Sequence, residues 1–460
     1  MLFDKILPPA KVHMLGIGGI SMSGLAEILK NKGYTVSGSD INHTHITDKL
    51  ESSGINVIYE HNAENVINKN AVIYTASIKP DNPEYQKALE LDIPLIERSV
   101  LLGEITKMFS DTIAISGTHG KTTTTSMISV VFLNAQKDPT IAVGGELPEI
   151  NSNYKIGNSQ YLITEACEYV DSFLKLFPKI SIVLNIEEDH LDYFKDINQI
   201  KKSFRNFLSL LPKDGLAIVN ADDANCMEVI NDTDAPVITV GIDNDATFMA
   251  KNIDFSNGNA EFDLYKNNEL IATITLAIPG KHNIYDALSC IAVADFYNID
   301  IEIIKNSLAS FRGAKRRFEL KGSFNGADIY DDYAHHPSEI KATLNAAKAK
   351  GKNKVICVFQ PHTYTRTKLL LDEFATAFEK ADEVIITDIY AAREKDTGDI
   401  HAKDLVNKVN EFSHNAKYIK DFEEIESYVK DNVGEGDLFF TIGAGNIFKI
   451  GENIIGASHR

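Results

Sequence analysis

Short apolar runs alternate with longer amphipathic segments along almost the whole chain. The runs are rich in Val and Ile and are bounded by polar residues or glycine, which is typical of strands buried in a sheet. The segments between them show helical spacing, and the segment at 23–33 ends at Gly33, a residue that suits a helix end. This alternation predicts α/β domains with mainly parallel sheets. The expected strands are 11–17, 35–39, 71–76, 112–117, 161–166, 181–186, 216–221, 354–359, 383–389 and 437–443.

Three glycine loops follow expected strands, at residues 16–24, 117–121 and 443–446. They lie in different thirds of the chain. A glycine turn between a buried strand and a helix is a common way to bring backbone N–H groups close to a phosphate. Each third of the chain is therefore a candidate for its own α/β domain and its own ligand.

A chain of 460 residues predicts roughly three domains, at about 150 residues per domain. We expect them to be 1–106, 107–315 and 316–460. Between about 240 and 275 the pattern changes to short alternating segments joined by Asn and Gly turns, which favours antiparallel strands. The middle domain is thus expected to contain a small β-rich subregion.

Composition and charge limit the possible partners. The net charge of -19 argues against a broad nucleic-acid interface, because such an interface needs clustered Lys and Arg. No apolar run reaches the roughly 20 residues that cross a bilayer, and the first ten residues lack the apolar core of a signal peptide. The four cysteines are far apart in sequence, so they form no zinc or redox motif. We expect a cytoplasmic protein that does not insert into membranes, as a monomer or homodimer.

The strongest local signal is TIAISGTHGKTTTT, at residues 112–125. Its glycines allow several N–H groups to face one anion at the start of a helix, Lys121 offers a positive charge to the β- and γ-phosphates, and the Thr122 hydroxyl can bind Mg²⁺. The common phosphate-loop pattern has a glycine where this chain has Ile115, so the loop is a shortened variant. A glycine turn with a surface lysine is the purely structural alternative.

Two further expected strands end next to ionisable residues. Glu165 ends the strand at 161–166, and His190 follows the strand at 181–186. Ligands of open α/β sheets gather at the carboxyl ends of the strands, so both side chains could meet Thr122 around a Mg²⁺ ion. His is a less usual Mg²⁺ ligand, and His190 could instead cap the next helix. The acidic residues before it are expected to be solvated: Glu187, Glu188 and Asp189.

The first glycine loop lies in VHMLGIGGISMSGLAEIL, and Asp40 follows the next expected strand. This arrangement is similar to a dinucleotide-binding fingerprint, in which an acidic residue binds a ribose, and it predicts a Rossmann-like N-terminal domain. It would fit an NAD-dependent oxidoreductase. A UDP group would satisfy the same backbone equally well, and tight packing of the strand against the helix is the structural alternative.

Taken together, these segments resemble the Mur ligase family. The resemblance covers essentially the whole chain, because the matching segments follow the family order from residue 13 to residue 367 and the strand and glycine loop near 440 match the family's end. The segments are HMLGIGGISMSGLAEIL, SGTHGKTTTTSM, EACEYVDSFL, NIEEDHLDYF, GKHNIYDAL, GAKRRFE, DDYAHHPSEI and QPHTYTRT.

The resemblance implies a UDP-sugar-binding first domain, a central P-loop ATPase domain and a Rossmann-like C-terminal domain that presents an amino acid. The implied ATP contacts are Gly117, Thr118, His119, Gly120, Lys121, Thr122, Thr123, His282, Asn283, Arg317 and Asp332. The implied Mg²⁺ ligands are Thr122, Glu165 and His190. The implied substrate contacts are Gly18, Gly19, Met22, Ser23, Ser39, Asp40, Ser77, Arg98, Tyr333, His335 and Arg366.

The sequence departs from the family pattern at several positions. Ser21 stands where the family usually has glycine, Asp286 replaces an asparagine, and Thr363 stands where some members have arginine. The first two are expected to adjust local packing or a nucleotide contact. The third leaves Arg366 as the clearer cation for a carboxylate.

The implied reaction joins L-alanine to the lactyl carboxylate of UDP-N-acetylmuramic acid through an acyl phosphate, with ATP as the phosphate donor. The implied catalytic residues are Lys121, His190, His335 and Arg366, and either histidine could accept the proton of the amine. A sister ligase for another amino acid or a recycled peptide is the alternative within the family. Outside it, the alternatives are the oxidoreductase above and a non-catalytic ATP-binding sensor.

Overall fold

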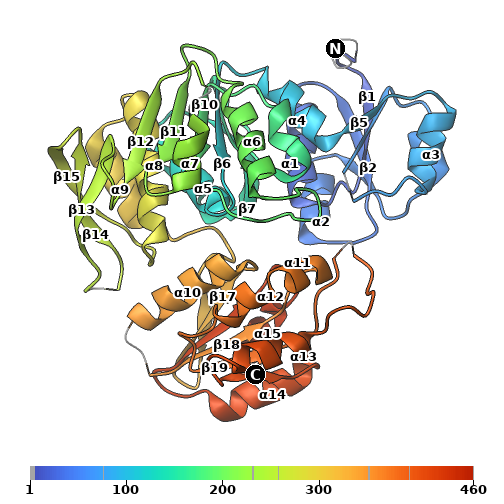
Figure 1. Ribbon diagram of the computed structural model, residues 1–460. Helices are drawn as coiled ribbons and strands as arrows, with labels where there is room; N and C mark the ends of the chain where they lie inside the picture. The colour runs from blue at the N-terminus through green and yellow to red at the C-terminus, as the bar shows by residue number, and fades with distance from the viewer. Residues whose placement is uncertain are drawn as a thin grey trace.

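The computed structural model describes residues 6–75, 77–230, 233–256, 258–350, 353–392 and 394–458. Ala76, the last residue of the expected strand at 71–76, lies outside the described residues. Three separate β-sheets follow one another along the chain, which confirms the predicted α/β architecture. The first two lie side by side, and the third lies beneath them (Figure 1).

The first sheet has the strand order β3-β2-β1-β4-β5, and every pairing in it is parallel. Strand β1 is central, with β2 and β3 on one side and β4 and β5 on the other. The glycine loop after β1 therefore lies where the strand order reverses, which is a common ligand-binding position in such sheets. The strands are β1 Lys11–Leu15, β2 Thr35–Ser39, β3 Asn56–Ile58, β4 Ala71–Tyr74 and β5 Leu95–Glu97. The helices are α1 Ile20–Asn31, α2 His45–Ser52, η2 Ala63–Val66, α3 Pro83–Glu90 and α4 Arg98–Thr106.

The middle sheet has ten strands in the order β15-β14-β13-β12-β11-β10-β6-β9-β7-β8. Its centre is parallel, while β8 at one end and β14 and β15 at the other pair antiparallel to their neighbours. The strands are β6 Asp111–Ser116, β7 Thr140–Leu147, β8 Ser152–Lys155, β9 Tyr161–Glu165, β10 Ile180–Val183, β11 Leu216–Asn220, β12 Val237–Gly241, β13 Phe248–Asp254, β14 Glu261–Lys266 and β15 Glu269–Thr275. The β-rich subregion predicted at about 240–275 is therefore confirmed.

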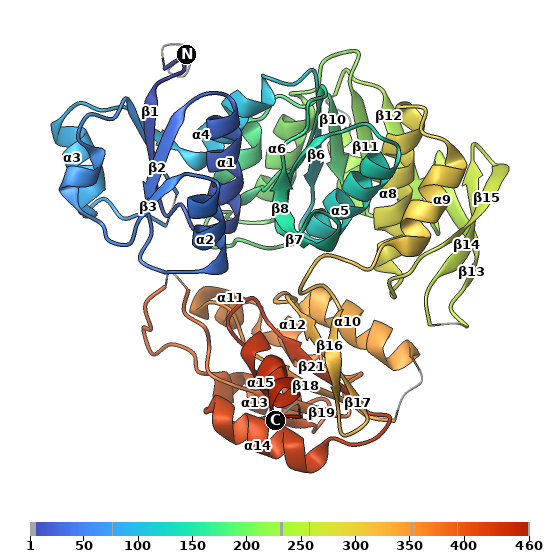
Figure 2. The same ribbon diagram turned by 180° about the vertical axis from the view of Figure 1, so that it is seen from behind.

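Helices cover both faces of this middle sheet. Helices α5, α8 and α9 lie on the face toward the viewer in Figure 2, while α6 and α7 lie on the face seen in Figure 1. The helices of this part are α5 Lys121–Asn134, η3 Pro148–Ile150, η4 Tyr169–Lys175, α6 Ile197–Leu208, α7 Ala224–Val229, α8 His282–Phe296 and α9 Ile301–Ser310. Helix α5 is buried almost throughout, which seats the phosphate loop on a rigid core.

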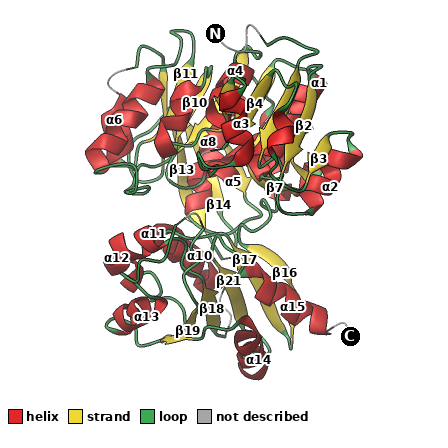
Figure 3. Cartoon of the chain, turned by 90° about the vertical axis from the view of Figure 1, so that its right-hand side faces the viewer, coloured by secondary structure: helices red, strands yellow, loops and turns green. Residues whose placement is uncertain are grey.

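The third sheet has the order β16-β17-β21-β18-β19-β20, with only β16 antiparallel to its neighbour. Figure 3 shows it below the other sheets, with helices on both sides. The strands are β16 Glu319–Phe324, β17 Ala327–Asp332, β18 Val355–Phe359, β19 Glu383–Ile386, β20 Ala416–Tyr418 and β21 Leu438–Ile442. The helices are α10 Pro337–Ala349, α11 Tyr364–Leu369, α12 Leu371–Ala375, α13 Ala402–Asn410, α14 Phe422–Asn432 and α15 Phe448–Ser458.

Each of the three glycine loops follows directly after a strand, as predicted: after β1, β6 and β21. In the middle sheet, β6 pairs in parallel with β9 on one side and β10 on the other. The residues that follow β6, β9 and β10 therefore lie together at one edge of that sheet. None of the helices in the described part of the chain has the length and apolar character needed to cross a membrane.

Candidate active site

The phosphate loop owes its shape to two glycines between β6 and α5. Gly117 has φ +139° and Gly120 has φ +84°, values that L side chains rarely adopt. A Cβ on Gly120 would lie 2.7 Å from Asp286 Oδ1. Because Gly120 is also the N-cap residue of α5, no side chain at that position caps the first turn, and its N–H groups are available to an anion. Ile115, where the common pattern has glycine, is fully buried in the core.

Lys121 stands at the start of α5 and is surrounded by acceptors. Its Nζ donates to the Thr118 carbonyl at 3.1 Å, to the Gly117 carbonyl, and to the two carboxylate oxygens of Glu168 at 3.1 and 3.3 Å. Burial opposes the positive charge, but the buried Glu168 carboxylate holds the pKa of Lys121 above its ordinary value. Lys121 is therefore a positively charged side chain at the phosphate loop, and in this structure Glu168 neutralises its charge.

The three predicted Mg²⁺ ligands line one cavity of about 690 Å³ at the edge of the middle sheet. Thr122 lies in the first turn of α5, and Glu165 Oε1 accepts a hydrogen bond from the Gly144 N–H at 2.6 Å. His190, with φ +53°, has its Nε2 4.0 Å from Glu168 Oε1. Burial lowers the pKa of His190, so its imidazole is neutral at neutral pH, the form that can bind a metal. A hydroxyl and a carboxylate beside a phosphate loop suit Mg²⁺.

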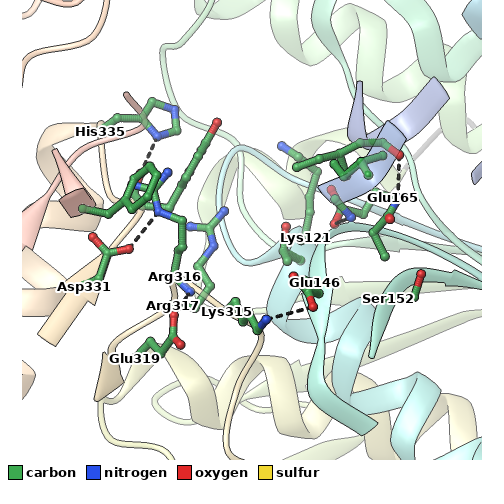
Figure 4. A pocket seen from close by; sticks show the side chains of 18 of the residues that line it. Lys121, Glu146, Ser152, Glu165, Lys315, Arg316, Arg317, Glu319, Asp331 and His335 are labelled. Carbon is green, nitrogen blue, oxygen red and sulfur yellow. Dashed lines mark hydrogen bonds and ion pairs between the residues drawn. The ribbon is translucent and has the colours of Figure 1, made fainter. Parts of the chain in front are cut away.

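All three parts of the chain contribute to this same cavity. Ser23 and Lys49 come from the first part, and Arg316 and His335 come from the last. In Figure 4 the cations Lys315, Arg316 and Arg317 lie opposite Lys121 and Glu165 across the cavity. The cavity therefore brings together groups held on different sheets, and the Lys and Arg side chains in its lining can bind phosphate.

A second cavity of about 220 Å³ opens beside the phosphate loop. Its lining includes Asn283, whose Nδ2 donates to the Pro279 carbonyl at 2.5 Å, and His282, whose pKa is lowered by burial to about 4. Asp332 lines it too, with its carboxylate accepting from Ala334 N and Thr343 Oγ1 at 2.9 Å each. The predicted ATP contacts that line it are His119, Gly120, Thr123, His282, Asn283, Arg317 and Asp332.

His119 connects this second cavity to the C-terminal part. Its Nε2 lies 3.4 Å from Glu187 Oε2 and its Nδ1 lies 3.3 Å from Glu339 Oε1. Burial alone would lower the pKa of His119, but the two carboxylates raise it to about 9. Arg317 Nη1 lies 3.6 Å from the same Glu339 oxygen. Sequence reasoning missed Glu339, whose position in DDYAHHPSEI was its only signal.

The expected solvation of the acidic run before His190 is wrong for Asp189. Glu188 is exposed and Glu187 is partly exposed, but Asp189 is buried and paired with Arg366. The Arg366 guanidinium donates three hydrogen bonds to this carboxylate, from Nε at 3.1 Å and from Nη2 at 2.9 and 3.3 Å. A partner 177 positions away in sequence decides the burial of Asp189, and local pattern carries no signal for it.

The first glycine loop borders a cavity of about 860 Å³. Arg98 reaches over it, and its Nη1 donates to Ser21 Oγ at 3.1 Å. The N–H of Gly18 donates to Asp40 Oδ2 at 3.0 Å, so this carboxylate already has a partner within the loop. The predicted substrate contacts that line the cavity are Gly19, Met22, Asp40, Ser77 and Arg98.

The structure does not bring every predicted substrate residue to this cavity. Ser39 is fully buried behind it, and its hydroxyl donates to Glu84 Oε2 at 2.7 Å. Ser23 donates to the Ile20 carbonyl at 2.8 Å and faces the central cavity instead. His61, which sequence reasoning missed, does line it, and its Nδ1 lies 2.6 Å from Glu84 Oε2.

A small cavity of about 140 Å³ lies between the middle and C-terminal parts. It is lined by three predicted residues, Tyr333, His335 and Arg366, together with His190 and Asp189. His335 Nδ1 is 3.0 Å from the Tyr333 carbonyl oxygen, and burial lowers the pKa of His335 to about 4. The cavity thus combines the Arg366 guanidinium with three carboxylates and three histidines: Asp189, Asp192, Glu394, His190, His335 and His362.

The departures from the family pattern all have local partners. Ser21 accepts the hydrogen bond from Arg98 described above. Asp286 accepts from Thr124 Oγ1 at 3.0 Å behind the phosphate loop, and burial raises the pKa of Asp286 to about 7. Thr363 has φ +70° and caps α11, with its Oγ1 accepting from the Arg366 N–H at 3.4 Å. Its role is therefore to orient the helix that carries Arg366.

A phosphate loop in the central of three α/β units, opening on a cavity that all three line, defines a nucleotide-using enzyme that joins groups held on separate domains. The chain belongs to the Mur ligase family. Profiles described as "Mur ligase family, catalytic domain", "Mur ligase middle domain" and "Mur ligase, glutamate ligase domain" match residues 11–110, 115–294 and 316–445. Membership excludes the oxidoreductase that the first glycine loop alone suggested.

Relatives and solved structures agree with this family over nearly the whole chain. The chain is 51% identical over 446 residues to the UDP-N-acetylmuramate–L-alanine ligase of Caldanaerobacter subterraneus, with 97% of each chain covered. It is 53% identical over 453 residues to the enzyme of that name from Acetivibrio thermocellus, again with 97% of each covered. The crystal structure of the UDP-N-acetylmuramate–alanine ligase of Thermotoga maritima matches with a TM-score of 0.84 at 28% identity, covering 98% of this chain and 99% of that one.

Proposed function

We propose that this protein is an ATP-dependent ligase that joins L-alanine to the lactyl carboxylate of UDP-N-acetylmuramic acid in peptidoglycan precursor synthesis. The observation that carries the proposal is the 690 Å³ cavity, because the phosphate loop, the candidate metal ligands and cations of the C-terminal part all line it. Relatives at about half identity over nearly the full chain carry the name of this activity.

Each of the three parts would then hold one substrate. Residues 1–106 would bind the UDP-sugar in the 860 Å³ cavity, residues 107–315 would bind ATP, and residues 316–460 would present the amino acid. The 140 Å³ cavity is small and has Leu370 and Ala444 in its lining, which suits an amino acid with a small apolar side chain. The cytoplasm, where ATP and amino acids are available, is the expected location.

The first chemical step is attack of the lactyl carboxylate on the γ-phosphate of ATP, giving an acyl phosphate and ADP. Lys121 leaves Glu168 and binds the transferred phosphoryl group, and the first-turn N–H groups of α5 hold the neighbouring phosphates. Thr122, Glu165 and His190 would hold Mg²⁺, which when bound neutralises charge on the phosphate oxygens. Arg317, which lines both the central and the nucleotide cavity, adds positive charge from the C-terminal part.

The second step is attack of the L-alanine amine on the acyl carbon, with release of phosphate. The ammonium group must first lose a proton. His335 lines the small cavity, and burial lowers its pKa to about 4, so its imidazole is neutral and can accept that proton. His190 lines the cavity too, but it could accept the proton only in a state in which it does not hold Mg²⁺. Closure of the C-terminal part over the middle sheet keeps water from the acyl phosphate.

The test is phosphate release and amide formation by the purified protein with ATP, Mg²⁺ and UDP-N-acetylmuramic acid, with and without L-alanine. We expect phosphate release that needs both substrates and matches the amide formed. Release with another amino acid or a short peptide, but not with L-alanine, would keep the ligase chemistry and replace the acceptor. Folded protein that releases no phosphate under any combination would contradict the proposal and favour a non-catalytic sensor.

A further inference from the structure

Arg366 and Asp189 form a buried ion pair between two separate parts of the molecule. Asp189 comes from the loop after β10 in the middle part, and Arg366 comes from α11 in the C-terminal part. Their side chains are only 9% and 11% exposed, and three hydrogen bonds join them. Asp189 is also 3.8 Å from His190 Nε2, and Arg366 Nη1 is 3.4 Å from His362 Nδ1.

Both members of this ion pair line the 140 Å³ cavity assigned above to the amino acid. Asp189 occupies Nε and Nη2 of Arg366, so a carboxylate that binds this pair of nitrogens must displace Asp189. Removing one member of a buried ion pair leaves the other charge uncompensated, which is strongly unfavourable. A ligand with a carboxylate alone would therefore gain one contact and expose a buried anion. A ligand with an ammonium group alone that takes Asp189 would similarly leave the guanidinium without its partner.

A free α-amino acid avoids this penalty because it carries both charges on adjacent groups. We propose that Asp189 and Arg366 together form a zwitterion site, in which the substrate carboxylate replaces Asp189 on Arg366 and the released Asp189 binds the substrate ammonium. Each buried charge then keeps an opposite partner throughout the exchange. This inference rests on the proposed function and adds Asp189 to it as a substrate-binding residue that selects for zwitterions and fixes the amine next to His190 and His335.

The inference predicts that Asp189→Asn weakens the binding of L-alanine and strengthens the binding of propionate. L-alanine loses its ammonium partner, so its KM should rise about 30-fold. Propionate, which has the carboxylate alone, no longer competes with a charged side chain for Arg366, so its inhibition constant should fall several-fold. Both are measured at saturating ATP and UDP-N-acetylmuramic acid. A purely structural role for the ion pair would move both constants in the same direction, and that result would overturn the inference.

Arg366→Gln is the mirror experiment and stands independently of the first variant. Here L-alanine should again bind more weakly, while ethylamine, which has the ammonium group alone, should inhibit more strongly because Asp189 is released. Unchanged or weaker inhibition by ethylamine would contradict the inference. Lys368→Ala is the matched control: Lys368 is on the same helix and pairs with Asp399 at 3.0 Å on the surface, so neither the L-alanine KM nor inhibition should change.

These outcomes are distinct from failure of the proposed function. If the wild-type protein forms no amide with L-alanine, the proposed function is wrong and the zwitterion site is wrong with it. If the wild type is active and the ATP KM of Asp189→Asn stays within about twofold of its value, a changed L-alanine constant reports on the amino-acid site alone.

Discussion

The first and second glycine loops have the same local plan but different electrostatics. Both follow an inner strand of a parallel arrangement and precede a helix, and each has a carboxylate packed against a glycine. At the first loop, Asp40 accepts backbone N–H bonds from Gly18 and Asn42 at 3.0 Å each. At the second, Asp286 accepts only the Thr124 hydroxyl among the bonds described, and Lys121 supplies a cation within the loop itself.

This difference shows why a glycine turn alone does not define a function. The cation of the first loop is Arg98, which comes from the start of α4 and is held over the loop through Ser21. Such an arrangement can recognise a diphosphate that stays intact. The second loop places its lysine at the first position of the helix, within reach of a phosphoryl group in transfer. Under the proposed function, the first loop would recognise the UDP-sugar and the second would carry out phosphoryl transfer.

The largest effect is expected for Lys121→Ala. Loss of the loop cation removes charge stabilisation in phosphoryl transfer, so phosphate release should fall by about 10³-fold or more, while UDP-sugar binding stays intact. A phosphate-release assay measures the rate, and a direct binding measurement gives the affinity for the UDP-sugar. Lys305→Ala, which breaks an exposed pair with Glu302 on α9, is the control and should leave both unchanged. Near-normal turnover of Lys121→Ala would mean that the second loop does not need its lysine for phosphoryl transfer, which would contradict the proposed difference between the two loops.

Alanine substitutions at one glycine of each loop should differ in their cost. Gly120→Ala imposes a left-handed φ of +84° on a side chain and brings Cβ within 2.7 Å of Asp286 Oδ1, so we expect a loss of about 3 kcal/mol in the free energy of unfolding. Gly16→Ala has φ +74° but open space around its Cβ, so only the backbone cost of about 1–2 kcal/mol applies. Denaturant unfolding compares them, and equal losses would contradict the packing argument.

Asp286 should make stability depend on pH. Burial raises the pKa of Asp286 from 3.8 to about 7, so the folded state holds a proton that the unfolded state releases. Its contribution is most favourable below pH 4 and is lost as the pH rises toward 7. Asparagine cannot ionise, so Asp286→Asn avoids the stability lost when Asp286 becomes charged. The variant should be more stable than the wild type by ~2 kcal/mol at pH 8. Thermal melting at pH 5 and pH 8 tests it, and a gain of the same size at both values would contradict the assignment.

The smallest effect is expected for Arg98→Ala. One charged contact to the diphosphate is lost, so the KM for UDP-N-acetylmuramic acid should rise about tenfold with little change in the ATP KM. Ser21→Gly, which removes only the hydroxyl that holds Arg98, should give a weaker shift in the same direction. A larger effect on ATP than on the UDP-sugar would mean that the first loop is not the UDP-sugar site.

Most of the inner strands and their loops could be predicted from sequence, because burial on both faces leaves a continuous Val and Ile signal. Strands such as β8 and β16 could not, because they are half-exposed and polar, with SNYK and ELKGSF as their sequences. Among site residues, Lys121 and Glu165 were marked by local motifs. Asp189 and Glu339 were not, since each acquires its environment from another part of the chain.

The contact between Lys121 and Glu168 bears on how the enzyme returns to its starting state. A phosphate that binds Lys121 exchanges one charge-assisted hydrogen bond for another, so its affinity reflects only the difference between the two. The Glu168 carboxylate lies 3.1 and 3.3 Å from Lys121 Nζ in this structure, so under the proposed mechanism it can take the place of departing ADP. We therefore expect Glu168 to ease product release at the cost of some affinity for nucleotide.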